Sequence, residues 1–241
     1  MKGVIIIMIL LMTPLAFAGT TKIYPTDDAY TDSSEPSRVF NNENLRAGND
    51  LNFGIHRSYL KFDLSSLNGK TITSAKFSID PIGSPVAPAE TIFVLQLYSI
   101  NSDSWNENNI NWNNAPPLGN LIEEKVITNP NRIEFNILNQ IEEQDRILSI
   151  GLKSNQESVS GSTGLYIVFF SNEDLQGQTY SPYIEVVYDG AGICTTDADT
   201  NSDGNISMSE LLSYINGWKS GSVTMSNLLN AIGFWKTGVG C

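Results

Sequence analysis

Twelve consecutive residues near the end of the chain carry the clearest chemistry in the sequence. Between Asp199 and Glu210, oxygen-bearing side chains stand at positions one, three, five, nine and twelve, Gly204 allows a sharp turn, and the seventh position offers a backbone carbonyl. Loops of this spacing bind Ca²⁺ through roughly six to eight oxygen ligands. We therefore expect one calcium ion, held by Asp199, Asn201, Asp203, Asn205, Ser207 and Glu210. The alternative is an Asn- and Asp-rich turn ahead of a helix, without metal.

The expected calcium loop leads into an internal repeat. Residues 204–221 align with residues 221–238, and in both copies apolar residues recur at helical intervals after a capping residue, Ser207 or Thr224. This pattern predicts two short amphipathic helices that pack against each other. Ser207 and Glu210 also have the spacing of a capping box, which fixes the start of the first helix.

A calcium loop, a helix and a second copy of that helix together resemble a dockerin. The resemblance covers residues 194–241, although Glu210 stands where dockerins usually have Asp. The second copy carries Asn216, Trp218 and Ser220 at the equivalent ligand positions, so we expect it to bind no calcium. The resemblance implies docking or tethering to a cohesin-like or other surface protein. A calcium-stapled C-terminal cap without a partner is the alternative.

The first eighteen residues have the layout of a signal peptide. Lys2 precedes an apolar run, and Ala16-Phe17-Ala18 offers the small residues of a cleavage site. A retained membrane anchor is the alternative, but the run contains a proline and is shorter than the roughly 20 apolar residues that a bilayer requires. We expect residues 1–18 to be removed, and a secreted or cell-surface protein without a membrane span. In an exported protein, Cys194 and Cys241 are expected to form a disulfide.

Composition and charge exclude several classes of function. The formal net charge is −12 at pH 7, and a deficit of Lys and Arg argues against nucleic acid as a partner. His56 is the only histidine, which excludes a His-rich metal site. The chain is long enough for one sizeable domain and one small one.

The region between the signal peptide and the tail has the pattern of an antiparallel β-sandwich. Short apolar runs alternate with clusters of Gly, Pro, Asn, Asp and Ser, and the dipeptide Asn68-Gly69 is typical of a hairpin turn. We expect a jelly-roll-like sandwich over residues 19–190, one helical turn near 136–143, and a small helical module over 191–241. The predicted strands are 59–64, 72–79, 92–98, 133–138, 147–152, 165–170 and 183–188.

Several strings in this region resemble the DNRLRE, or disaggregatase-related, family. They are Arg57-Ser58-Tyr59-Leu60-Lys61-Phe62-Asp63-Leu64, Ile72-Thr73-Ser74-Ala75, Trp105-Asn106-Glu107, Asn111-Trp112-Asn113-Asn114-Ala115-Pro116, Phe170-Ser171-Asn172-Glu173 and Ser181-Pro182-Tyr183. The resemblance spans nearly all of residues 22–188. It implies a sandwich of the kind found as carbohydrate-binding modules and in cell-surface proteins, with no catalytic domain in this chain.

Two groups of residues could bind a polysaccharide or surface glycan. Trp105 and Trp112 could stack on sugar rings, although both could instead pack a long loop. Arg57, Tyr59 and Lys61 share one face of a predicted strand and would suit an acidic polysaccharide, although a simple solvated face is the alternative. Asp63 and Glu107 are interpreted as loop-capping carboxylates.

The sequence therefore favours a non-catalytic carbohydrate-binding or adhesion protein with a calcium-stabilised tail. A structural surface subunit without sugar specificity is the alternative. A polysaccharide lyase could use a histidine base near Arg57, Tyr59 and Lys61, but His56 and Tyr59 lie on opposite faces of a regular strand. We therefore expect no enzyme activity.

Overall fold

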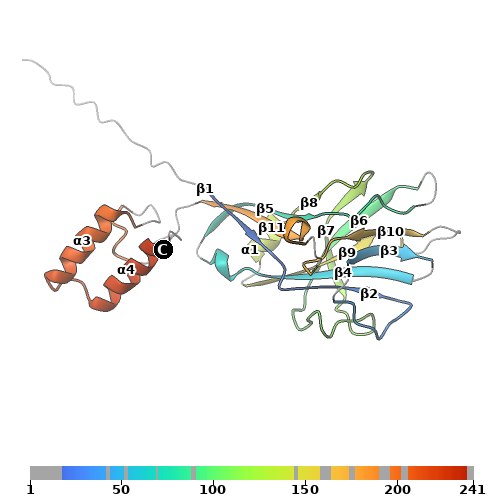
Figure 1. The fold of residues 1–241 in the computed structure, drawn as a ribbon, viewed down its shortest axis with the longest axis horizontal. Coiled ribbons are helices and arrows are strands. Elements are labelled where there is room, and N and C mark those ends of the chain that lie inside the picture. The colour runs from blue at the N-terminus through green and yellow to red at the C-terminus, as the bar shows by residue number, and fades with distance from the viewer. Residues whose placement is uncertain are drawn as a thin grey trace, which may run out of the picture. The chain divides into compact units, whose positions relative to one another are not determined.

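The chain divides into two compact units, which are described separately below. The larger unit contains Thr20–Asn68 and Ile72–Val187, and the smaller contains Tyr188–Cys241 with two short segments, Met1–Gly19 and Gly69–Thr71. A computed structural model describes residues 18–41, 44–51, 54–68, 70–87, 91–143, 146–157, 164–173, 177–189, 196–201 and 206–237 (Figure 1).

The larger unit is built from two β-sheets. The four-stranded sheet has the order β1 (Ala18–Ile23), β11 (Tyr183–Asp189), β5 (Thr71–Ile79) and β8 (Ile133–Asn136). The seven-stranded sheet has the order β10 (Leu165–Phe169), β3 (Leu45–Asp50), β4 (Gly54–Asp63), β9 (Ile147–Ser154), β6 (Phe93–Ile100) and β7 (Leu118–Ile127), while β2 (Asp27–Asp32) also pairs with β4. The paired strands of the seven-stranded sheet run antiparallel, as do β5 and β8. The prediction of a mostly β antiparallel sandwich is confirmed.

The core lies between the two sheets and follows from strand alternation. On β4, Leu60 and Phe62 point inward and are fully buried. The ring of Phe62 meets the ring of Phe77 on β5 edge-on, with centroids 6.0 Å apart, and Phe77 stacks on Phe135 of β8. Aromatic contacts between strands of opposite sheets hold the two layers together.

The predicted hairpin at Asn68-Gly69 is wrong. Strands β4 and β5 belong to different sheets, and the short 3₁₀ helix Ser65–Leu67 carries the chain from one to the other. Gly69 itself lies outside the described residues. Asp63 caps this turn by accepting a hydrogen bond from the backbone N–H of Ser65 at 2.8 Å, which confirms the loop-capping interpretation. Hydrogen bonding to the Ser65 side chain, followed by this backbone bond, lowers the pKa of the Asp63 carboxyl.

Every predicted strand is present, and the expected helical turn is α1 (Leu138–Glu143). The sequence pattern missed β1, β2, β3 and β7, and also the short helix α2 (Gly177–Tyr180). None of the helices among the described residues is both long and apolar enough to cross a membrane.

The smaller unit contains the two predicted helices, α3 (Met208–Lys219) and α4 (Met225–Thr237). Ser207 caps α3 in a capping box with Glu210, as predicted. Two apolar residues of the first repeat, Leu212 and Trp218, are exposed and do not pack between the helices. Successive helical residues point about 100° apart, so Leu211 in the core turns Leu212 to solvent. The buried residues of this core are Ala198, Ile206, Leu211, Tyr214, Leu228 and Ala231.

Several predictions concern residues that the structure does not describe. They are the signal peptide up to residue 17, the cysteines Cys194 and Cys241, and the loop ligands Asp203 and Asn205.

Candidate functional site

The outer face of the seven-stranded sheet contains the glycan-binding candidates, but only part of it is accessible. Strand alternation places Arg57, Tyr59 and Lys61 on this face, as predicted. Tyr59 is only 1% exposed and Lys61 only 8% exposed, which contradicts a solvated polar face. Both residues are therefore unavailable to a polysaccharide. Burial also raises the pKa of Tyr59.

The connection between β6 and β7, residues 101–117, covers these two side chains. Trp105 from this loop is 5% exposed and packs edge-on against Tyr59, with ring centroids 6.1 Å apart. The ammonium group of Lys61 lies 4.6 Å from the Trp105 ring centroid, donates a hydrogen bond to the Trp105 carbonyl oxygen and pairs with Asp27. Ile110 completes this second, smaller core. Trp105 is therefore a packing residue and does not bind sugar.

Arg57 and Trp112 lie where the loop leaves the sheet open. The Arg57 guanidinium lies over the Trp112 ring, 4.9 Å from its centroid, and both side chains are half-buried. Arg57 also donates two hydrogen bonds of 2.7 Å to the carboxylate of Glu157. The hydrogen bond to Glu157 is the main reason that the pKa of Arg57 is raised. This arrangement presents a charged group and an aromatic ring side by side.

Polar and aromatic side chains of β6 and β9 continue the same open surface. Gln96 pairs in register with Lys153, and the Lys153 ammonium lies 5.4 Å from the Tyr98 ring centroid. Tyr98 donates a hydrogen bond of 3.1 Å to Gln96, which in turn donates one to Glu124. Burial, followed by the nearby carboxylate of Glu124, raises the pKa of the Tyr98 hydroxyl.

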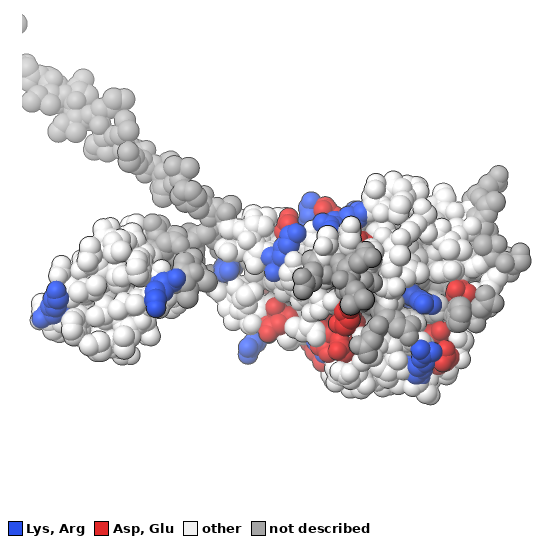
Figure 2. Space-filling model, in the orientation of Figure 1, with Lys and Arg blue, Asp and Glu red and all other residues white. Residues whose placement is uncertain are grey.

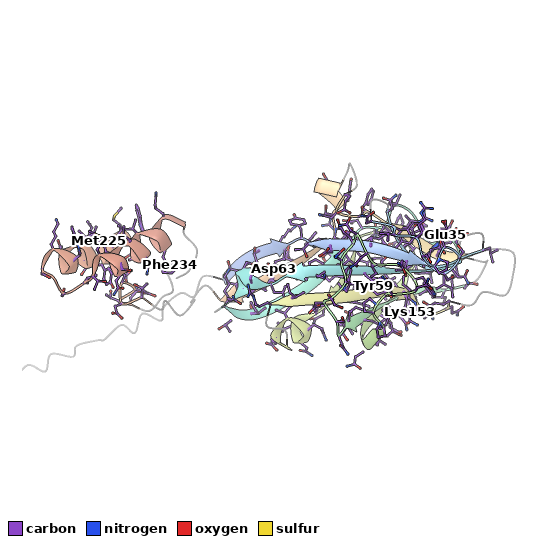
Figure 3. All side chains as sticks on the ribbon, turned by 90° about the horizontal axis from the view of Figure 1, so that it is seen from below. Glu35, Tyr59, Asp63, Lys153, Met225 and Phe234 are labelled. Atoms are coloured by element: carbon purple, nitrogen blue, oxygen red, sulfur yellow. The ribbon has the colours of Figure 1, made fainter. Side chains whose placement is uncertain are left out.

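We call this half-buried surface the outer strip, and define it as Arg57, Gln96, Tyr98, Trp112 and Lys153. Figure 3 labels Tyr59 on β4 and Lys153 on β9, the neighbouring strands from which the covered and open parts of this face arise. On the face of the sandwich shown in Figure 2, basic and acidic side chains lie interspersed, without one broad patch of a single sign.

A shallow hollow at the β7–β8 connection is the rival candidate. It is lined by residues 125–129 and 131–134, and its lining includes no aromatic side chain. Its lining holds two cations, of which Arg132 donates hydrogen bonds to both oxygens of Asp80 and lies over Tyr183. Sugar sites use aromatic platforms together with polar groups, which favours the outer strip.

His56 does not join Arg57 in a site. It is fully buried, its Nε2 lies 3.3 Å from Asp32 Oδ2, and burial lowers its pKa. His56 points away from the outer face because neighbouring strand residues alternate. The residues considered for a lyase therefore do not converge.

The loop predicted to bind calcium is described only in part, and the residues at its two ends are among those described. The Glu210 carboxylate accepts hydrogen bonds from the backbone N–H groups of Thr200, Asn201 and Ser207 at 2.9–3.1 Å. Burial opposes ionisation of Glu210, but these bonds outweigh it and lower its pKa to about 2. Asp199 is buried beside them. A carboxylate that is ionised at neutral pH thus joins the two ends of the predicted calcium loop.

The two-layer antiparallel sandwich, with aromatic, amide and charged side chains on one open sheet face, is the architecture of a carbohydrate-binding module. Residues 19–186 match carbohydrate-binding module family 96, and the chain belongs to this family. Members of such families are non-catalytic binding domains.

A gellan lyase from Bacillus sp. is 31% identical over 121 residues, covering 48% of this chain and 5% of that protein. The chain thus spans only a small part of this curated relative. Among solved structures, one match is described as the structural basis for the promiscuous specificity of carbohydrate-binding modules from the β-sandwich superfamily. The alignment covers 73% of this chain and 57% of the other chain, at 15% identity. Its TM-score of 0.22 is too low to support any conclusion.

Proposed function

We propose that the sandwich binds an acidic polysaccharide along the outer strip without cleaving it. Family membership supports polysaccharide as the ligand class. The observation that carries the choice of surface is the presence of two cation–aromatic pairs, Arg57 with Trp112 and Lys153 with Tyr98, on one open sheet face. Aromatic rings stack on sugar faces, while cations pair with sugar carboxylates.

Glu157 provides a sharp test of this proposal. Its carboxylate holds the Arg57 guanidinium in a two-pronged pair, the geometry that a sugar carboxylate would adopt. An acidic polysaccharide must therefore compete with Glu157 for Arg57. Glu157→Gln should weaken this internal pair and tighten binding of acidic polysaccharide.

Retardation in affinity gels containing gellan, polygalacturonate or neutral dextran measures these effects. Arg57→Ala should abolish retardation by at least one acidic glycan, and Glu157→Gln should increase it. The matched control is Arg132→Ala, which removes an equally two-pronged Arg–carboxylate pair over a tyrosine elsewhere on the sandwich. The control should leave retardation unchanged.

Three results would contradict the proposal. Loss of binding in Arg132→Ala but not in Arg57→Ala would move the site to the β7–β8 hollow. Release of oligosaccharides from any glycan would show catalysis. No retardation by any glycan would favour a structural subunit without sugar specificity.

We further propose that the protein is exported and that the tail is a calcium-stabilised attachment module for another surface protein. The Glu210 carboxylate, held between both ends of the predicted loop, supports the calcium part of this proposal. Bound calcium would fix the loop and the start of α3 together, so metal affinity would add to folding stability. Calorimetry of the whole protein tests this, because Glu210→Gln should remove one binding equivalent of calcium.

A further inference from the structure

Three carboxylates from distant parts of the sequence converge at one end of β2. Asp28 lies on β2, Glu107 lies in the β6–β7 loop, and Glu173 follows β10. One carboxylate oxygen from each lies within 4.8 Å of the other two. Two ligands on opposite sides of a Ca²⁺ ion are about 4.8 Å apart, since each Ca–O distance is about 2.4 Å. The spacing therefore fits a single bridging cation.

Asp28 supplies an independent indication of a ligand. Its side chain is 99% buried, and Oδ2 accepts a hydrogen bond of 2.9 Å from the backbone N–H of Asn172. Oδ1, however, is buried without any hydrogen-bond partner among the described residues. A buried carboxylate oxygen without a donor is costly, because desolvation removes its water partners. A cation would supply the missing partner.

The surrounding charges make the same point. None of the ion pairs among the described residues involves Asp28, Glu107 or Glu173. Three carboxylates this close together repel one another unless a positive charge lies between them.

We infer that Asp28, Glu107 and Glu173 bind a divalent cation, and that Ca²⁺ is its natural occupant. All three ligands are carboxylates, which hard cations prefer. Two of them lie in irregular loops, which suit the flexible coordination of Ca²⁺ better than the strict octahedral coordination of Mg²⁺. The ion joins β2, the β6–β7 loop and the segment after β10. It therefore anchors the loop whose Trp112 belongs to the outer strip.

The test separates this site from the predicted loop in the tail. The whole protein carrying Asp199→Asn and Glu210→Gln is stripped of metal and titrated with CaCl₂ at pH 7.0 by calorimetry. We expect this variant to bind one Ca²⁺ per chain. Saturating Ca²⁺ should also raise the midpoint of thermal unfolding of the sandwich by several degrees. Near-UV circular dichroism measures this midpoint.

Adding Glu173→Gln should weaken Ca²⁺ binding at least tenfold, and adding Asp28→Asn should abolish it. Glu173 is exposed, so its variant keeps the test valid if Asp28→Asn fails to fold. Glu124→Gln, which neutralises an exposed carboxylate on β7, is the matched control and should bind Ca²⁺ normally. No binding in the tail-loop variant, or equal binding after Glu173→Gln, would overturn the inference. Preference for Mg²⁺ over Ca²⁺ would overturn the identity of the ion.

Discussion

Trp105 and Trp112 belong to neighbouring motifs but should respond to substitution in opposite ways. Trp105→Ala removes a 95% buried indole that packs on Tyr59 and Lys61. Buried Trp→Ala substitutions cost about 3–5 kcal/mol. In a domain of this size, each 1 kcal/mol lowers the unfolding midpoint by about 2–4 °C, so we expect a loss of roughly 10 °C. Trp112→Ala removes a half-buried ring and should cost about 1 kcal/mol or less.

A third variant tests the reasoning more finely. The Nε1–H group of Trp105 is buried without an acceptor among the described residues, so Trp105→Phe deletes an unsatisfied donor while keeping an aromatic edge against Tyr59. Trp105→Phe should therefore cost less than half as much as Trp105→Ala.

Urea and thermal unfolding measure the stabilities, and affinity gels measure binding. Trp112→Ala should lose glycan binding while remaining folded. A Trp105→Ala variant as stable as the unsubstituted protein, or a Trp112→Ala variant that is equally destabilised, would refute the assignment of one tryptophan to packing and the other to binding.

Four further predictions concern protonation, backbone geometry and the tail. Burial lowers the pKa of His56, so the unfolded chain binds the proton more readily than the folded protein does. The free energy of unfolding should therefore fall as the pH drops below about 6.5, which urea unfolding midpoints would measure. His56→Gln should reduce this pH dependence. Because the pKa of Glu210 is lowered to about 2, its ionised carboxylate should stabilise the smaller unit above about pH 4.5, and this stabilisation should vanish towards pH 2. Far-UV circular dichroism of the helices measures this change, and Glu210→Gln should not show it. Gly48→Ala should prevent stable folding, measured by soluble yield and unfolding midpoint, because its φ of +119° and the closely approaching carbonyl of β10 leave no room for a Cβ. Non-reducing peptide mapping should find Cys194 joined to Cys241, and two free thiols would contradict that prediction.

The alternation of apolar and polar residues predicted the inner strands, because side chains of these strands point alternately into the core and away from it. It missed β2 and β3, whose sequences DDAYTD and LRAGND are rich in Asp, Asn and Gly, residues of low strand propensity. These segments are strands because β4 pairs with both along one edge. Tertiary pairing overrides local propensity here, and no window of sequence contains that information.

The sequence likewise predicted only part of the candidate site. Alternation correctly placed Arg57, Tyr59 and Lys61 on one face, but only the structure shows that a loop covers two of them. The predicted calcium loop in the tail could be recognised as a pattern because its residues are close in sequence. Asp28, Glu107 and Glu173 could not, because they are far apart in sequence and converge only in the folded sandwich.

The loop of residues 101–117 both completes a small core and sets the edge of the outer strip. Its length therefore determines how much of the sheet is available to a ligand. A shorter loop would expose Tyr59 and Lys61 to solvent, whereas a longer one would enclose Arg57 and narrow the open surface. Insertions or deletions in this one segment would thus alter the open face of the sheet while both sheets and the core between them remain unchanged.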